Sequence, residues 1–325
     1  MKPLTRLLAL FFALTVCLGT CACNQTADTP AAKPTAAVCG LAGPTGVGLA
    51  DLMHRNETGD TALSYTVTLA TSPEEIVGKL TAGEVDFAAL PTNLAATLYK
   101  KTNGGIKVLA LCTGCVLYVV ENGDSIHTVA DLKGKTVFSA GEGANPEYIL
   151  RHLLSQNGLD PDTDVTLHFV AENDELASAL IGKKADVALV PEPLCSTVLQ
   201  KNPALRVALS VGDTWNGTVP YMGCIAVRTA VVNESPAVVQ AFLSDYKTSV
   251  ETATADPKSV AALCEQYGII SKAAIAEKAL PRCALTCITG GAMRPALDPY
   301  LSVLFAADPK SVGGTLPDKE FYYEA

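Results

Sequence analysis

Apolar runs of strand length alternate with helical stretches along the chain. Residues 72–75 (SPEE) place a cap, a proline at the first helical position and a glutamate at the third, which predicts a helix ending near Gly83. The apolar run 85–90 then predicts a strand that Pro91 closes, and 93–100 predicts the next helix. Alternation of this kind is typical of α/β proteins with a largely parallel sheet.

The same pattern returns 100 residues later. Residues 66–97 align without a gap on 166–197, and eight of the aligned positions are identical. Chance would supply roughly two identities in a window of this size, so we interpret the segments as copies of one structural unit. Looser similarity extends upstream, where predicted strands at 37–41 and 135–139 each precede a glycine-rich turn and a helix. The sequence therefore predicts two small α/β lobes.

The remaining segments are predicted to complete these lobes. We assign 37–118 together with 224–325 to lobe 1, and 119–223 to lobe 2. Two crossing segments, near 116–120 and 221–226, would form a hinge that allows the lobes to close over a ligand. Ligands of parallel sheets bind outside the carboxyl ends of the strands, so the function is expected in a cleft between the lobes.

The N-terminus has the order of an export signal. A positively charged start precedes an apolar run over 7–19, which is too short to span a membrane. The end of this signal resembles a bacterial lipobox, in which Cys23 fits the lipidated position better than Cys21; an ordinary signal peptide is the alternative. We predict a lipoprotein signal peptide over 1–22 and a flexible, Pro- and Ala-rich tether over 23–36.

Composition and missing motifs exclude several functions. The formal net charge is −9 and there is no basic stripe, which argues against nucleic acid as a partner. The glycines of 43–48 do not follow the dinucleotide-binding order, and neither a serine-hydrolase elbow nor a zinc-protease motif occurs. The four histidines lack the spacing of metal ligands or of a catalytic triad. We predict no catalytic residue, metal or cofactor.

Eight cysteines follow Cys23, an even number that permits disulfides in an exported protein. Cys112 and Cys115 form a CxxC pair, but they interrupt an apolar, strand-like run from 108 to 120 rather than opening a helix. We favour buried free thiols over disulfides, and both over a metal site.

The candidate ligand-binding residues lie in the turns and strand ends that would line the cleft. They are Pro44, Thr45, Gly46, Thr92, Asn93, Thr113, Gly141, Glu142, Gly143, Ala144, Asn145 and Glu192. Glycine-rich turns that lead into helices offer unpaired backbone N–H groups to an anionic or carbonyl-bearing molecule. The four loops expected to line this cleft are 43–48, 91–93, 141–147 and 191–193. They contain no Lys, Arg or His, and their glutamates also suit a ligand amine or ring N–H.

Several segments resemble one family. They are 43–46 (GPTG), 84–93 (EVDFAALPTN), 129–136 (VADLKGKT), 191–193 (PEP), 235–243 (SPAVVQAFL) and 311–318 (SVGGTLPD). Together with the repeat and the lipobox, they are similar to the solute-binding lipoproteins of ABC importers, closest to the nitrate/sulfonate/taurine and thiamine-precursor group. The resemblance implies an α/β fold of the type II periplasmic-binding kind, with two lobes, a hinge and an interlobe cleft.

The resemblance also implies a function. The protein would be a monomer on the extracytoplasmic face of the membrane, attached only through its lipid. It would capture a small molecule, such as a sulfonate or a pyrimidine, and deliver it to an ABC permease without chemistry. A redox-active or passive surface lipoprotein, or a non-transport enzyme on the same fold, remains the alternative.

Overall fold

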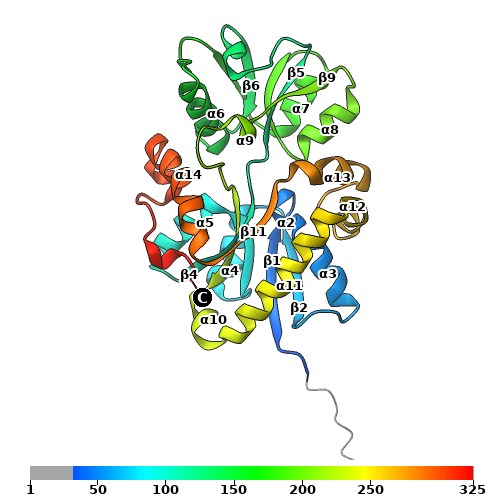
Figure 1. The fold of residues 1–325 in the computed structure, drawn as a ribbon, viewed down its shortest axis with the longest axis vertical. Helices are drawn as coiled ribbons and strands as arrows, with labels where there is room; N and C mark the ends of the chain where they lie inside the picture. Colours follow the sequence, from blue (N-terminus) through cyan, green and yellow to red (C-terminus); the bar gives the residue numbers. More distant parts are fainter. Residues whose placement is uncertain (1–31, 325) are drawn as a thin grey trace, which may run out of the picture. The chain divides into compact units, whose positions relative to one another are not determined.

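Two β-sheets, each flanked by helices, make up the fold (Figure 1). The computed structural model describes residues 32–324, and Pro34–Ala325 forms one compact unit. The predicted signal peptide, Cys21, Cys23 and the tether as far as residue 31 lie outside the described residues. Within the described part of the chain, no helix is both long enough and apolar enough to span a membrane.

The first sheet has six strands, in the order β11-β4-β10-β3-β1-β2. Their bounds are β1 Thr35–Leu41, β2 Ser64–Ala70, β3 Phe87–Pro91, β4 Ile106–Thr113, β10 Gly223–Arg228 and β11 Leu285–Ile288. Strands β1, β2 and β3 are parallel, whereas β10 lies antiparallel between β3 and β4. Buried apolar side chains fill β3 and β10 almost continuously, as expected for strands covered on both faces.

The second sheet has five strands, in the order β7-β6-β8-β5-β9. Their bounds are β5 Leu117–Asn122, β6 Thr136–Ala140, β7 Thr166–Val170, β8 Val187–Pro191 and β9 Leu205–Ser210. Its arrangement repeats that of the first sheet: β6, β7 and β8 are parallel, and β5 lies antiparallel between β8 and β9. The repeat at an offset of 100 residues thus places β2 with β7 and β3 with β8 in equivalent positions.

Helices connect the strands and cover the sheets. Those before β10 are α2 Pro44–Val47, α3 Ala50–Glu57, α4 Pro73–Ala82, α5 Thr92–Lys101, α6 Asn145–Gln156, α7 Asn173–Ile181, α8 Leu194–Lys201 and α9 Val211–Thr214. Those after it are α10 Thr229–Glu234, α11 Pro236–Ala255, α12 Pro257–Gln266, α13 Ala273–Ala279 and α14 Met293–Ala307. Short 3-10 turns lie at Val129–Leu132, Leu280–Arg282, Gly290–Ala292, Pro309–Val312 and Lys319–Phe321.

Local sequence signals explain where α4 begins and ends. The Ser72 hydroxyl accepts a hydrogen bond from the Glu75 backbone N–H, and Pro73 takes the first helical position, as predicted. Gly83 ends the helix in the left-handed conformation, with φ of 75°, which a side chain would disfavour. The elements on which the prediction of an α/β fold rested are therefore present.

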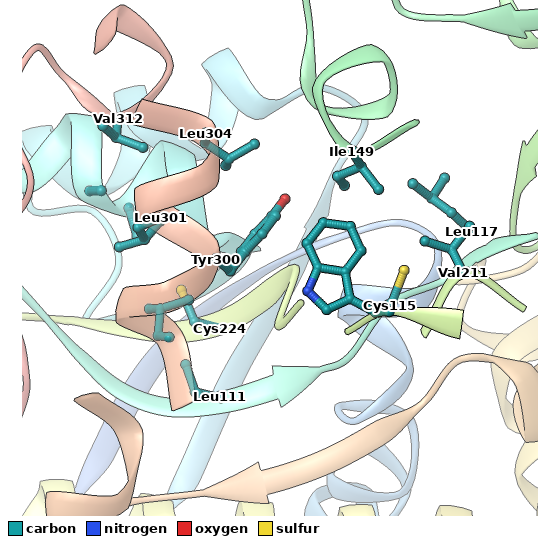
Figure 2. Packing of buried hydrophobic residues seen from close by; sticks show 14 of the residues in the cluster. Leu111, Cys115, Leu117, Ile149, Val211, Cys224, Tyr300, Leu301, Leu304 and Val312 are labelled. Carbon is teal, nitrogen blue, oxygen red and sulfur yellow. The ribbon is translucent and has the colours of Figure 1, made fainter. Parts of the chain in front are cut away.

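One apolar core runs through both halves of the described unit. It contains Leu111 of β4, Leu117 of β5, Ile149 of α6 and Tyr300 of α14, all at most 1% exposed. Figure 2 shows Tyr300 on the side of α14 that faces Ile149, and Leu301 on the other side, toward Val312. Helix α14 therefore contacts elements of both halves of the molecule.

The structure shifts several predicted boundaries. Strand β1 begins at Thr35, so the last two residues of the predicted tether belong to a strand. Leu117 and Tyr118, assigned to lobe 1, are the first residues of β5 in the second sheet, and Gly223, assigned to lobe 2, opens β10 in the first. The apolar run 108–120 is two strands in different sheets, because the chain crosses between the sheets at 114–116. We call the two sheets with their helices lobe 1 (first sheet) and lobe 2 (second sheet).

Candidate ligand site between the lobes

The strand register shows where the two lobes meet. The chain enters lobe 2 through 114–116, and its first residue there, Leu117, pairs with Pro191 at the carboxyl end of β8. It returns to lobe 1 through 211–222, and Gly223 pairs with Pro91 at the carboxyl end of β3. Both crossings therefore reach the carboxyl ends of the parallel strands. This is the edge at which ligands of parallel sheets bind.

A cavity of about 230 Å³ lies at this edge of lobe 2. Its lining residues come from the ends of β6, β7 and β8 and from the starts of α6 and α7: Ser139, Ala140, Gly141, Pro146, Ala171, Glu172, Asn173, Leu189 and Pro191. The Ser139 side chain is buried, and its hydroxyl donates to the Ala140 carbonyl oxygen at 2.9 Å. Of the predicted ligand-binding residues, Gly141 lines this cavity directly.

Glu192 lies at the same edge, but its carboxylate is already bound by other groups of the protein. Its carboxylate accepts hydrogen bonds from the backbone N–H and the hydroxyl of Ser196, at 3.1 and 3.0 Å. Arg282 reaches it from lobe 1, with 3.6 Å between Nη1 and Oε1, and also donates to the Ser196 hydroxyl. Burial raises the pKa of Glu192, and the hydrogen bonds from Ser196 and the charge of Arg282 oppose that rise. Glu192 thus joins the lobes and caps α8.

The equivalent positions in lobe 1 are also satisfied internally. Thr92 is fully buried, and its hydroxyl donates to the Tyr221 carbonyl oxygen at 2.8 Å. The half-buried Asn93 donates to the Ser311 carbonyl oxygen at 3.4 Å. Thr113 is 2% exposed, at the end of β4. Thr92 thus holds the crossing segment, and Asn93 the C-terminal region, against lobe 1.

The loop after β1 follows a packing constraint. Pro44 and Thr45 are half-buried, whereas Gly46 is buried. A Cβ atom on Gly46 would lie 2.4 Å from the Leu41 carbonyl oxygen, so the loop requires glycine for this close approach. Gly46 therefore shapes the loop. Of the ligand-binding residues predicted in this loop, only Pro44 and Thr45 are accessible to a ligand.

The loop after β6 mixes exposed and anchored residues. Glu142, Gly143 and Ala144 are exposed, and the Gly143 backbone N–H donates to the Glu147 carboxylate at 2.7 Å. Asn145 opens α6, and its amide donates to the Tyr300 hydroxyl of α14 at 3.3 Å. This contact joins lobe 2 to the helix that packs between the lobes.

Comparison with known proteins decides the family. The sequence profile described as "ABC transporter, phosphonate, periplasmic substrate-binding protein" matches residues 55–273, about two thirds of the chain. The chain belongs to this family. Substrate-binding proteins of this family are extracytoplasmic and work with an ABC transporter, so the solute-binding function expected from the sequence is confirmed at that level. No curated protein sequence matches the chain.

Solved structures show the same fold for this substrate-binding protein. An ABC transporter structure from Parabacteroides distasonis has a TM-score of 0.77 at 23% identity, covering 90% of this chain and 99% of the other. The periplasmic aliphatic sulphonate binding protein SsuA from Escherichia coli gives 0.71 at 17%, covering 90% and 93%. The alkanesulfonate-binding SsuA from Xanthomonas axonopodis pv. citri, bound to MOPS, gives 0.60 at 16%, covering 89% and 96%. The periplasmic-binding fold predicted from the sequence is confirmed.

The cysteines of this binding protein are packed rather than poised for chemistry. All eight in the described residues are free thiols, seven buried and Cys287 half-buried. Burial raises the pKa of both Cys112 and Cys115 to about 12, which makes their thiolates rare at neutral pH. Among the described residues, no group of three His, Cys, Asp or Glu side chains could hold a metal ion.

Sequence reasoning missed the residues that link the lobes. Arg282, Tyr300 and Tyr118 contact the opposite lobe, and the Tyr118 hydroxyl donates to the Arg282 carbonyl oxygen at 2.8 Å. The paired residues are far apart along the chain. The separation is 164 residues for Tyr118 and Arg282, 155 for Asn145 and Tyr300, and 86 for Ser196 and Arg282. Arg282 is the basic residue closest in sequence to the start of β11, but no local pattern marks its partner in the other lobe.

Proposed function

We propose that this chain is an extracytoplasmic solute-binding lipoprotein that captures a small molecule between its lobes and delivers it to an ABC permease. The observation that carries the proposal is the meeting of both crossing segments at the carboxyl ends of β3 and β8. This places the ligand-binding edges of two parallel sheets next to the hinge, where a ligand that contacts both lobes would favour their closed arrangement.

Binding would use the cavity at the ends of β6, β7 and β8 in lobe 2, with Pro44 and Thr45 on the side of lobe 1. Gly141 to Asn145 would contribute backbone and amide groups from the start of α6. Glu192 and Thr92 would support the site through their internal bonds, and the buried Thr113 through its packing, rather than touch the solute. The proposal refines the predicted set of site residues into contacts and supports.

Ligand-dependent stabilisation of the chain from residue 34 tests the function. A panel of methylphosphonate, ethanesulfonate, taurine, nitrate, an aminopyrimidine and choline is screened by thermal unfolding. A solute at a hundredfold excess over its Kd adds about 2.7 kcal/mol of stability. We expect one class to raise Tm saturably, and small-angle scattering to show a smaller radius of gyration in its presence.

Two tryptophan variants of α7 localise the effect. Asn173→Trp fills the cavity and is expected to abolish the Tm increase, whereas Ser178→Trp, at an exposed position of the same helix, should retain it. An equal increase in both variants would place binding elsewhere. No increase with any member of the panel would contradict capture of these solutes.

The lipid anchor is tested by fractionating cells that express the full chain. We expect Cys23→Ser to move the protein from the membrane pellet to the soluble extracytoplasmic fraction, because a lipid on this residue would be its attachment. Cys21→Ser is the matched control and should stay in the pellet. Release by Cys21→Ser alone would assign the lipid to Cys21, and retention of both variants would contradict lipidation at this motif.

A further inference from the structure

The ligand-binding edges of the two sheets are acidic. We consider the turns that follow β1, β2, β3, β6, β7 and β8, with the first turn of the helix after each. These residues, all described by the structure, contain no Lys, Arg or His. They contain eight carboxylates: Glu74, Glu75, Glu142, Glu147, Glu172, Asp174, Glu175 and Glu192.

Several of these carboxylates already neutralise the helix ends that could attract an anion. Glu147 lies in the first turn of α6, and Asp174 and Glu175 lie in the first turn of α7. Glu192 accepts the Ser196 backbone N–H in the first turn of α8. A carboxylate at a helix N-terminus interacts favourably with the positive end of the helix dipole. These helix ends therefore offer an incoming anion little net attraction.

Two arginines near this edge are paired with its carboxylates as well. Arg282 is paired with the buried Glu192, and Arg151 with Glu147 at 2.7 Å. Two glutamates at the cavity of lobe 2 have no such partner. Glu172 lines the cavity and Glu142 follows its lining residue Gly141, and neither forms an ion pair with a described residue.

We propose that the solute presents a positively charged nitrogen to this cavity, and that free phosphonate and sulfonate anions are rejected. This inference rests on the proposed function, and it names the charge class of the solute at the same site. Glu172 supplies the countercharge, with Glu142 reinforcing it from the adjoining loop. The Ser139 and Asn173 side chains and the backbone around Gly141 supply neutral hydrogen-bonding groups.

Electrostatics gives the discrimination its physical basis. An anion brought to the cavity meets Glu172 and Glu142, no Lys, Arg or His among the described residues lines the cavity, and juxtaposed like charges disfavour binding. A cation meets the opposite situation, because Glu172 and Glu142 attract it. The expected selectivity follows from the sign of charge alone.

Three probes with the same butyl chain isolate that sign: butylammonium, butanesulfonate and butylphosphonate. Each is titrated calorimetrically into the chain from residue 34 at low and at high ionic strength. We expect saturable binding of butylammonium, weaker at high salt, and no binding of the two anions. Glu172→Gln should weaken butylammonium binding about tenfold, and Asn173→Trp should abolish it. Glu234→Gln, a charge-neutralising control at the exposed end of α10 in lobe 1, should change it less than twofold.

The outcomes separate this inference from the proposed function. Binding of butanesulfonate or butylphosphonate that Asn173→Trp abolishes would overturn the charge class while supporting solute capture at this site. Failure of butylammonium to bind would overturn the charge class, and the wider panel would still decide the function. Butylammonium binding that Glu172→Gln leaves unchanged would remove Glu172 as the countercharge. Glu172→Gln replaces an exposed side chain without a side-chain hydrogen bond, so the variant is expected to fold.

Discussion

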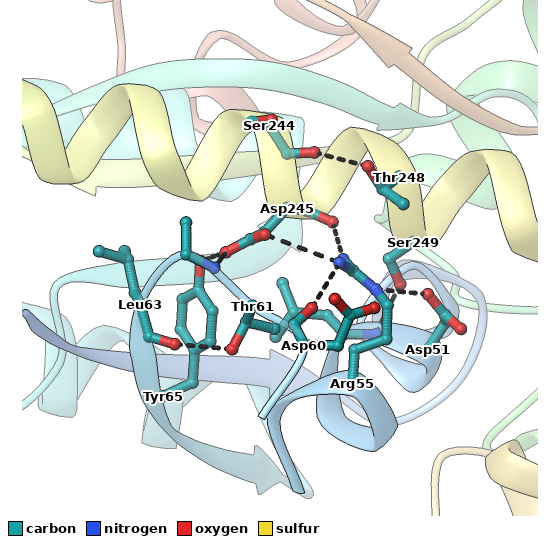
Figure 3. Close-up of polar contacts among 12 residues, drawn as sticks. Asp51, Arg55, Asp60, Thr61, Leu63, Tyr65, Ser244, Asp245, Thr248 and Ser249 are labelled. Atoms are coloured by element: carbon teal, nitrogen blue, oxygen red, sulfur yellow. Dashed lines mark hydrogen bonds and ion pairs between the residues drawn. The ribbon is translucent and has the colours of Figure 1, made fainter. Parts of the chain in front are cut away.

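Replacing Asp245 by alanine is expected to lower the free energy of unfolding by about 3–5 kcal/mol, since it removes the acceptor of a buried polar network. Asp245 lies on α11 and is 7% exposed. Its carboxylate accepts the Ala62 backbone N–H and the Tyr65 hydroxyl, both at 2.8 Å, and lies 3.7 Å from Arg55 (Figure 3). The variant leaves the buried Tyr65 hydroxyl without its acceptor, which costs more than the bond contributed.

Urea unfolding of the chain from residue 34 measures this effect. Ser244→Ala, one residue earlier on α11 and exposed, is the matched control and should change stability by less than about 0.5 kcal/mol. Asp245→Asn keeps the shape and one acceptor oxygen, so its loss should fall between the two. If Asp245→Ala unfolds at the same urea concentration as the wild-type chain, the network does not stabilise the packing of α11 on lobe 1.

Replacing Arg282 by methionine is expected to destabilise the protein by about 1–3 kcal/mol at pH 7.5, because the Glu192 carboxylate would stay buried without its cation. The expected loss is smaller than for a fully buried ion pair, because the Arg282 side chain is 34% exposed and the charges are 3.6 Å apart. The variant also removes the hydrogen bond from Arg282 to the Ser196 hydroxyl. The loss is expected to weaken the contact between α13 and α8.

The pH dependence distinguishes this mechanism from lost packing. Burial raises the pKa of Glu192 above its ordinary value, so the folded chain holds this proton more tightly than the unfolded chain. The contribution of this carboxyl to stability is therefore greatest below its unfolded pKa and falls as pH rises through the folded one. Removing Arg282 raises the folded pKa further. The stability difference between Arg282→Met and wild type should thus shrink as pH falls from 7.5 to 4.5, because protonation of Glu192 removes the buried charge.

The double variant Glu192→Gln with Arg282→Met supplies the control. Without a carboxylate to bury, its unfolding free energy should depend on pH like that of Glu192→Gln alone. A deficit in Arg282→Met that is equal at pH 4.5 and 7.5 would show that the arginine acts through its apolar stem rather than through its charge.

The repeat is what made the fold predictable from the sequence. Local signals such as Ser72 to Glu75 set the helix starts, and the 100-residue offset indicated two lobes of like construction. Strand β11 was missed, because its four half-buried residues have neither the length nor the alternation that marks a strand. The first crossing was predicted near 116–120 but lies at 114–116, because the buried strands on either side of it have the same apolar composition.

The site was predictable only as a region. Sequence position located the carboxyl ends of the strands, because topology alone decides where they meet. It did not reveal which polar side chains are already satisfied. Thr92 and Glu192 have the chemistry of ligand contacts, yet their partners Tyr221 and Arg282 are 129 and 90 residues away along the chain. Pairing over such distances leaves no local pattern.

The order of the strands has a consequence for how the chain acquires its structure. Strands β5 to β9 are consecutive, so lobe 2 contains every strand of its sheet within one continuous segment. Strand β4, in contrast, is joined to β3, β1 and β2 only through β10. Contacts between distant segments form late, since closing a long loop costs entropy before the contacts compensate. We expect the inserted half to gain its native architecture first, and the flanking half to remain an incomplete sheet until β10 docks between β3 and β4.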